Sequence, residues 1–132
     1  MSTDLSWLLD QLCHDTPGVR HALLLSSDGM KVAYDKSLDL DSADLLSAIC
    51  SGLLSLSNKL DKAFNAGYPA LTISIDTPRA QLLVVGAGTG GVLAAVAESE
   101  ADPGIVGTAM SQLVERVADH LSVPTRAPRT QP

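Results

Sequence analysis

The chain has 132 residues, a formal net charge of −6 and an apolar fraction of 45%, to which aromatic residues contribute little. This length predicts one domain with a core of its own. The negative charge argues against nucleic acid or an anionic membrane surface as a partner, because both select basic surfaces.

The first elements are a helix and a hairpin. Apolar residues recur at helical spacing over residues 3–14, and Pro17-Gly18 ends this pattern. Two apolar runs, at 21–26 and 30–34, flank Asp28-Gly29. Asp-Gly between such runs predicts a β-hairpin, because Gly tolerates the positive φ that a tight turn needs.

The longest expected element is a helix of about 24 residues, which begins at a cap on Asp41 or Ser42 and ends at Gly67. No residue inside it breaks helices strongly enough to divide it. Its apolar residues recur at helical spacing and form one stripe: Leu45, Ile49, Gly52/Leu53, Leu56, Leu60 and Phe64.

The second half of the chain begins with strands. Residues 70–76 alternate between apolar and polar side chains, which predicts a strand, and Thr77-Pro78-Arg79 predicts a turn. AQLLVV at 80–85 is a second strand. VLAAVA at 92–97 fits either a strand or a short helix.

A final helix starts at Asp102-Pro103, because Asp is a cap and Pro fits the first helical turn. Its stripe comprises Val106, Met110, Leu113, Val117 and Leu121. We expect a single domain over 1–122 and a disordered, proline-rich tail over 123–132.

The predicted order is α-β-β-α-β-β-β-α, with the seventh element as a strand. Hairpins outnumber crossover connections in this order. We therefore predict an α+β fold in which helices cover a mostly antiparallel sheet.

A glycine motif lies in VVGAGTGGVLAAVA, where Gly86, Gly88 and Gly91 match G-x-G-x-x-G. In dinucleotide-binding folds this motif starts a helix, and a second parallel strand ends in an acidic residue about 20 residues further on. Here that position falls inside the final helix. We interpret the glycines as a hairpin loop and expect no cofactor; a helix at Val92–Ala97 would contradict this interpretation.

Other signals for chemistry are weak. His14, His21 and His120 have no metal-type spacing, and no serine lies in a G-x-S-x-G motif. Cys13 and Cys50 lack C-x-x-C spacing and are interpreted as buried or half-buried free thiols. We expect no metal site and no enzymatic activity.

Targeting signals are weak as well. The N-terminal stretch MSTDLSWLL is acidic and lacks the basic region of a signal peptide. No apolar run approaches the roughly 20 residues of a membrane span. We therefore expect a cytoplasmic protein that does not insert into a membrane.

Small polar residues recur every four positions along the long helix, at Ser47, Ser51 and Ser55, and Asn58 and Lys62 continue the line. A solvated helix face also has this appearance, but it usually carries charges. No charged residue occurs between Asp44 and Lys59 in this helix. This absence of charge favours a face that is packed within the chain or binds a partner.

The strand at 70–76 has no proline or lysine in its middle, so nothing prevents another strand from pairing with its edge. A symmetric pairing of two such edges would place two long helices side by side. A homodimer would explain both the strand edge and the serine line.

Three stretches resemble the Roadblock / dynein light chain domain family, in its small actinobacterial form, which is conservon-type and MglB-like. GVRHALLLSSDGMKVAYD resembles the family's first hairpin and LDLDSADLLSAICSGLLSLSNKL its long helix. VLAAVAESEADPGIVGTAMSQLVERV resembles the last strand, an acidic link and the final helix. The three stretches occur in the order that the family has, and the resemblance extends over about residues 5–121.

The resemblance implies a profilin-like, five-stranded antiparallel sheet in the order 2-1-5-4-3, with the long helix on one face and the other two helices on the opposite face. It also implies a non-catalytic homodimer that regulates or scaffolds a small Ras-like GTPase in a bacterial signalling module. The GTPase would dock on the paired long helices. A sensor-kinase-like protein is a further candidate partner, and a partner could recruit the protein to a membrane.

We expect two sets of residues at the interfaces. The helix-mediated contact is expected to use Ser47, Ser51, Leu54, Ser55, Asn58 and Lys62. The pairing strand is expected to use Leu71, Ile73 and Ile75.

Two other classes of function remain open at this point. A profilin-like domain can be a small-molecule sensor, which would need a cavity with convergent polar groups. A nucleotide-dependent enzyme would depend on the glycine motif alone.

Overall fold

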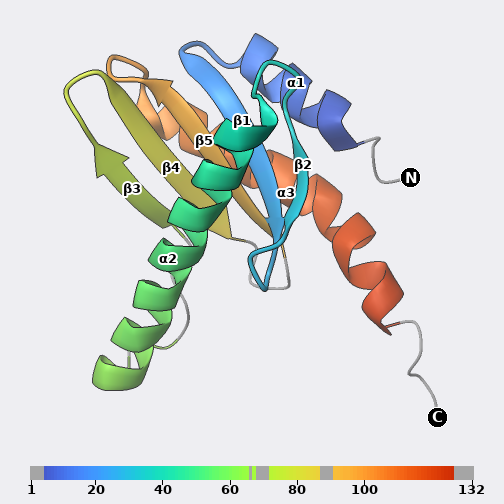
Figure 1. The fold of residues 1–132 in the computed structure, drawn as a ribbon, viewed down its shortest axis with the longest axis vertical. Helices are drawn as coiled ribbons and strands as arrows, with labels where there is room; N and C mark the ends of the chain where they lie inside the picture. The colour runs from blue at the N-terminus through green and yellow to red at the C-terminus, as the bar shows by residue number, and fades with distance from the viewer. Residues whose placement is uncertain (1–4, 66, 68–71, 87–90, 127–132) are drawn as a thin grey trace.

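The computed structural model describes residues 5–65, 67, 72–86 and 91–126, and side chains as far as Val117. In this part of the chain the elements follow the expected order (Figure 1). They are α1 (Ser6–Asp15), β1 (Val19–Ser26), β2 (Lys31–Tyr34), α2 (Leu40–Phe64), β3 (Thr72–Asp76), β4 (Ala80–Gly86), β5 (Gly91–Glu98) and α3 (Pro103–Arg126).

The described strands form one antiparallel sheet in the order β2-β1-β5-β4-β3. In Figure 1, α2 crosses one face of this sheet, and α1 and α3 lie on the opposite face. The predicted α+β class, the strand order and the placement of the helices are all confirmed.

The glycine motif joins two antiparallel strands. β5 begins at Gly91, and Gly86 at the end of β4 lies opposite Val92. Val92–Ala97 is therefore a strand, and the helix that a dinucleotide-binding turn requires is not there. The hairpin interpretation is confirmed, although Gly88 lies outside the described residues.

The central strands are apolar on both faces because helices cover both faces of the sheet. Successive residues of β1 point to opposite sides. Ala22 and Leu24 belong to the core under α1 and α3, whereas Leu23 and Leu25 belong to the core under α2.

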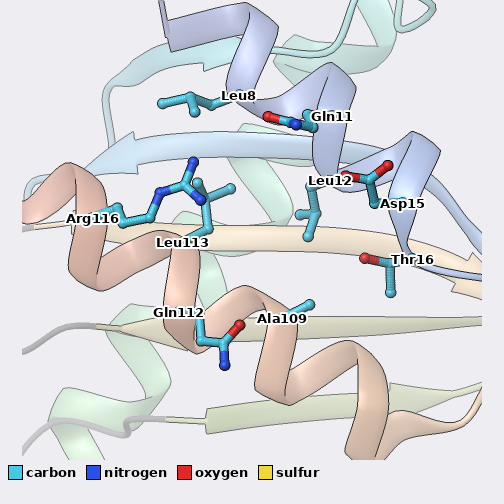
Figure 2. A pocket seen from close by; sticks show the side chains of 9 residues that line it. All are labelled: Leu8, Gln11, Leu12, Asp15, Thr16, Ala109, Gln112, Leu113 and Arg116. Carbon is cyan, nitrogen blue, oxygen red and sulfur yellow. The ribbon is translucent and has the colours of Figure 1, made fainter.

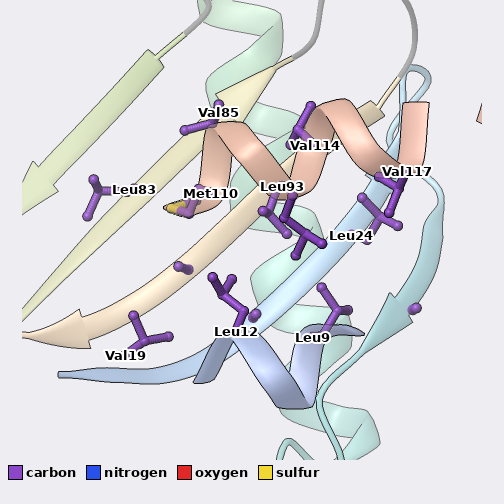
Figure 3. Close-up of a cluster of buried hydrophobic side chains, with 14 of the residues drawn as sticks. Leu9, Leu12, Val19, Leu24, Leu83, Val85, Leu93, Met110, Val114 and Val117 are labelled. Atoms are coloured by element: carbon purple, nitrogen blue, oxygen red, sulfur yellow. The ribbon is translucent and has the colours of Figure 1, made fainter. Parts of the chain in front are cut away.

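The larger core fills the space between the sheet, α1 and α3 (Figure 3). Leu9 and Leu12 enter it from α1, and Met110 and Val114 enter it from α3. Burying a side chain of this kind contributes about 1.5–3 kcal/mol. This core fixes both shorter helices on the sheet.

The ends of α2 differ slightly from the expected ones. The cap is Asp39, whose side chain accepts the N–H of Ser42 at 3.3 Å. Hydrogen bonds from the hydroxyl and the N–H of Ser42 lower the pKa of Asp39. At the other end, Asn65 adopts the left-handed conformation (φ 54°) that closes the helix before Gly67.

The buried residues of α2 are Ala43, Leu46 and Cys50. Of the longer apolar stripe that the sequence shows, Leu53 packs partly against the core under α2, whereas Leu45, Ile49, Leu56, Leu60 and Phe64 are exposed. Small and medium side chains make the contact because they allow the helix to approach the strands closely. The exposed residues of the stripe are left facing outward.

α3 extends to Arg126, beyond the domain boundary expected at residue 122. The sequence predicts a tail there because residues 122–132 hold three prolines and no apolar pattern. Pro124 is nevertheless accommodated within the last turns of α3. The rest of the expected tail, 127–132, lies outside the described residues.

Candidate interaction surface

Two groups of side chains lie on opposite flanks of α2, on either side of its buried face. One group, here called the serine flank, comprises Ser47, Ser51, Ser55, Asn58 and Lys62. The other, the apolar flank, comprises Leu45, Ile49, Leu56, Leu60 and Phe64. The two flanks differ in what they contact.

The beginning of the serine flank packs on the β1–β2 turn of the same chain. The hydroxyl of Ser47 donates to the carbonyl oxygen of Gly29 at 3.4 Å. Gly29 has a φ of +88°, and a Cβ atom there would lie 2.6 Å from Oγ of Ser51. Glycine is therefore needed both for the turn and for the close approach of α2.

An ion pair fixes the same turn to the first part of α2. Nζ of Lys31, at the start of β2, lies 2.5 Å from Oδ1 of Asp44. The hydrogen bond to Asp44 raises the pKa of Lys31. The β1–β2 turn therefore contacts α2 at two positions, Gly29 with Ser47 and Lys31 with Asp44.

The remainder of the serine flank faces solvent. Ser55, Asn58 and Lys62 are exposed, and Leu54 is partly buried against the core under α2. A shallow hollow of about 240 Å³ separates this part of the helix from the turn at Ser27–Gly29. The structure therefore divides the expected set: Ser47 and Ser51 make contacts within the chain, and Ser55, Asn58 and Lys62 are open to a partner.

The apolar flank is exposed along the whole helix. The exposed fraction is 64% for Leu45, 63% for Leu56 and 76% for Phe64. A row of large apolar side chains that faces solvent indicates a contact surface for another molecule. The interface assigned from the sequence did not include this row, although the second apolar set of Ala43, Leu46 and Cys50 already offered a core-facing side.

β3 adds apolar surface beside α2. Among the described strands it pairs only with β4 and therefore forms one edge of the sheet. Ile73 packs partly against the core under α2, and Ile75 is 37% exposed on the same face. Leu71, the third expected residue of this strand, lies outside the described residues.

The opposite edge of the sheet is better protected against pairing. β2 has four residues and starts with Lys31, and its register with β1 is irregular between Leu24 and Leu25. Charged side chains, short length and irregular register all disfavour pairing with another strand. β3 pairs with β4 in a regular register, and its charged residue, Asp76, lies at its end, so β3 is the more open edge.

The sequence shows no uninterrupted apolar run near the length of a membrane span. By length and composition alone, however, the whole of α2 is long and apolar enough to cross a membrane. Its most apolar window reaches a mean hydropathy of 1.2, and 22% of that window is buried. The hydropathy of α2 is high because the apolar flank adds to the apolar residues on the side of the helix that packs on the sheet. Because α2 packs on the sheet through Ala43, Leu46 and Cys50, we interpret the exposed apolar flank as surface for protein contact.

A groove between α1 and α3 is the place to test the sensor alternative (Figure 2). Its residues are Leu8, Gln11, Leu12, Asp15, Thr16, Ala109, Gln112, Leu113 and Arg116. Its volume is about 190 Å³. Ligand sites usually have volumes of about 300–1,000 Å³, so this groove is too small for a typical ligand. Two other hollows, of about 300 Å³ beside Gly18 and about 350 Å³ between Thr72 and α3, reach only the lower end of that range.

His21, Asp35 and Ser37 lie together where β2 leads into α2. Nδ1 of His21 lies 3.2 Å from Oδ2 of Asp35 and 3.2 Å from Oγ of Ser37. In a catalytic triad the serine and the carboxylate approach different ring nitrogens. Here both approach the same one, so the cluster is not a nucleophile relay.

Neither cysteine of the chain is arranged for reaction. Both are free thiols, Cys13 half-buried and Cys50 buried. Burial, with the nearby charges of Asp35 and Asp10, raises the pKa of Cys13 to about 12, and burial raises that of Cys50 to about 11. Within the described residues, no group of three or more His, Cys, Asp or Glu side chains could hold a metal ion.

Comparison with known proteins agrees with this architecture. The Roadblock/LC7 domain family matches residues 5–97 of the chain. A Roadblock/LC7 domain from Streptomyces avermitilis is 36% identical, with a TM-score of 0.81 over 89% of this chain and 97% of that chain. A comparison with curated proteins gives no match.

Two more distant structures share the fold. MglB from Myxococcus xanthus is 14% identical, with a TM-score of 0.77 over 92% of this chain and 97% of that chain. Profilin from Schizosaccharomyces pombe is 14% identical, with a TM-score of 0.61 over 87% of this chain and 97% of that chain. These two show a common fold alone, whereas the family match and the Streptomyces structure carry the assignment: the chain belongs to the Roadblock/LC7 domain family.

Proposed function

We propose that the protein is a non-catalytic, homodimeric regulator or adaptor of a small Ras-like GTPase in a bacterial signalling module. The observation that carries this proposal is the exposed apolar flank of α2 beside the open edge of β3. Family membership and the likeness to MglB support it.

The dimer would form through both features together. The serine flank contacts the β1–β2 turn, so the apolar flank points away from that turn, toward the side of the sheet where β4 and β3 lie (Figure 1). Ile73 and Ile75 are on the same face of the sheet as α2. A second copy that extends the sheet at β3 would therefore also cover the apolar flank.

The GTPase would dock on the surface that the dimer leaves open. Ser55, Asn58 and Lys62 at the exposed end of the serine flank are polar and uncrowded, and the dimer would present two copies of them. The protein would act by binding and ordering the GTPase, without chemistry of its own. We place this activity in the cytoplasm, with recruitment to a membrane by a partner such as a sensor-kinase-like protein.

The dimer is tested by sedimentation velocity at micromolar concentration with two matched variants. Leu56→Asp changes the apolar flank and Ser55→Asp changes the neighbouring residue on the serine flank, and both side chains are exposed, so the fold should persist. We expect Leu56→Asp to shift the protein to monomer and Ser55→Asp to leave the dimer intact. The opposite result would place the contact on the serine flank, and a monomeric wild type would contradict the dimer.

The GTPase role is tested by pull-down with small Ras-like GTPases from the same organism, loaded with GDP or with a non-hydrolysable GTP analogue. We expect one nucleotide form to bind and Lys62→Glu with Ser55→Asp to weaken that binding while the dimer persists. Failure of both nucleotide forms to bind would contradict the GTPase role.

A further inference from the structure

Thr16, which directly follows α1, carries a hydroxyl group that has no hydrogen-bond partner among the described residues. Thr16 is only 6% exposed. In Figure 2 its hydroxyl points toward the space between α1 and α3, which is the groove that Leu12 and Ala109 also line. Buried polar groups in native proteins are nearly always paired. The groove is therefore where this hydroxyl meets a partner from outside the chain.

Other polar groups around the groove are free as well. The side chains of Gln11 on α1 and Gln112 on α3 are exposed, and neither forms a hydrogen bond with a described residue. An amide both donates and accepts hydrogen bonds, as a hydroxyl does, and a peptide backbone offers both kinds of group. Leu12 and Leu113 form an apolar floor. With a volume of about 190 Å³, the groove suits an aliphatic side chain and the backbone of a peptide segment.

The groove continues into the hollow of about 300 Å³ beside Gly18. Gly18 comes two residues after Thr16, and Ile105, which also lines the hollow, lies one turn before Ala109 on the same face of α3. Ile105 is 56% exposed and adds apolar surface where the two depressions meet. We call the groove and the hollow together the α1–α3 trough, which lies between residues 8–18 and residues 98–116.

The hollow end of the α1–α3 trough is acidic. Glu98, Glu100 and Asp102 line the hollow, and Asp15 lies on the adjoining rim of the groove. Among the described residues one ion pair reaches these carboxylates: Nε of Arg20 lies 3.7 Å from Oε2 of Glu98, and both side chains are about half exposed. A surface with this excess of exposed carboxylates attracts and orients a basic partner.

We propose that the α1–α3 trough binds an extended, basic segment of a partner protein that places an aliphatic side chain in the groove. The basic side chains lie over the carboxylates of the hollow, and the backbone bonds to the hydroxyl of Thr16. Arg116 lies at the opposite end of the groove and points from α3 toward α1 (Figure 2). Its charge confines the basic part of the segment to the hollow end.

This surface lies apart from the contacts of the proposed dimer and GTPase. α1 and α3 cover the face of the sheet opposite α2 (Figure 1). A segment in the α1–α3 trough therefore leaves α2 and the edge of β3 free. The trough adds a second contact face to the protein and does not depend on the dimer.

Selection of short random peptides by display on the full-length protein tests the trough, and fluorescence anisotropy of an enriched, labelled peptide gives its Kd. We expect enriched peptides to combine Lys or Arg with an aliphatic residue. Glu100→Lys in the hollow should weaken binding several-fold. Glu115→Lys makes the same change of charge on the exposed surface of α3 outside the trough and should leave Kd within about twofold.

Thr16→Val separates a binding role from a structural one. It removes the hydroxyl but keeps a side chain of similar shape, and the hydroxyl has no partner among the described residues. We therefore expect an unchanged Tm and a Kd about two- to tenfold weaker. A lower Tm with an unchanged Kd would make the hydroxyl structural and overturn its assigned role.

Three other results would overturn the proposal: no enriched peptide, enrichment of acidic peptides, or equal effects of Glu100→Lys and Glu115→Lys. The dimer is distinguished by Leu56→Asp, which changes the exposed flank of α2 on the opposite face. We expect this variant to bind the peptide as wild type does, even where it no longer dimerises. Loss of peptide binding in Leu56→Asp would place the peptide on α2 and not in the α1–α3 trough.

Discussion

The carboxylate of Asp35 accepts the backbone N–H of Ala22 at 2.9 Å, and the two residues are 13 positions apart in the sequence. Asp35 is buried, and its other oxygen accepts the hydroxyl of Ser37 at 2.6 Å. The backbone N–H of Asp35 in turn donates to the carbonyl oxygen of Ala22. One side chain thus attaches the start of the β2–α2 connection to the middle of β1.

Replacing Asp35 should destabilise the fold. Asp35→Ala leaves the buried N–H of Ala22 without its acceptor, which costs about 1–3 kcal/mol of unfolding free energy. Asp35→Asn keeps an acceptor oxygen and should cost less. Urea denaturation monitored by circular dichroism measures both variants, and equal stability of Asp35→Ala and wild type would contradict the role of this carboxylate.

Two glycines with positive φ should respond differently to alanine. At Gly18 (φ +88°) a Cβ atom would lie 2.6 Å from Cβ of Ala101, which cannot rotate away. At Gly67 (φ +106°) a Cβ atom would meet no heavy atom within 4 Å, so only backbone strain of about 1–2 kcal/mol applies. Thermal unfolding should show a larger loss of Tm for Gly18→Ala than for Gly67→Ala; the reverse order would contradict the close contact.

The two thiols should be almost unreactive in the folded protein. With pKa values of about 12 for Cys13 and about 11 for Cys50, little thiolate exists at pH 8. Alkylation by iodoacetamide should be slow, rise with pH and become fast when urea unfolds the chain. Rapid alkylation of the native protein at pH 8 would contradict the burial of these groups.

The same pKa values give a pH dependence of stability. Above the unfolded value of 9.0, the unfolded chain releases thiol protons that the folded chain retains. The unfolded state then binds fewer protons, so the free energy of unfolding falls as pH rises from about 9 toward 11. Urea midpoints at pH 8 and pH 10.5 measure this loss, which a Cys13→Ala/Cys50→Ala variant should show to a smaller extent.

α1 offers a matched test of the larger core. Leu9 is fully buried among residues of the sheet and α3, whereas Trp7 is 56% exposed. Leu9→Ala should lower the free energy of unfolding by about 2–5 kcal/mol through lost contacts and a cavity. Trp7→Ala should cost much less, and similar losses for the two variants would contradict the packing of α1.

The sequence alone determined most of the fold. Helical and alternating periodicities, the Asp28-Gly29 turn and the Pro17-Gly18 break are local patterns, so they are readable from neighbouring residues. The glycine motif was interpreted correctly because its context lacked the second parallel strand. The strand order came from the resemblance to a family.

The tertiary structure decided which side of α2 faces the sheet. In the sequence, two sets of apolar residues and one line of serines could each form the side of α2 that faces the sheet. Helical periodicity alone does not distinguish between them. Packing against closely spaced strands selects the small set of Ala43, Leu46 and Cys50 and brings Ser47 and Ser51 onto the turn at Gly29. The apolar flank is thereby left exposed, because its position depends on distant strands rather than on its own sequence.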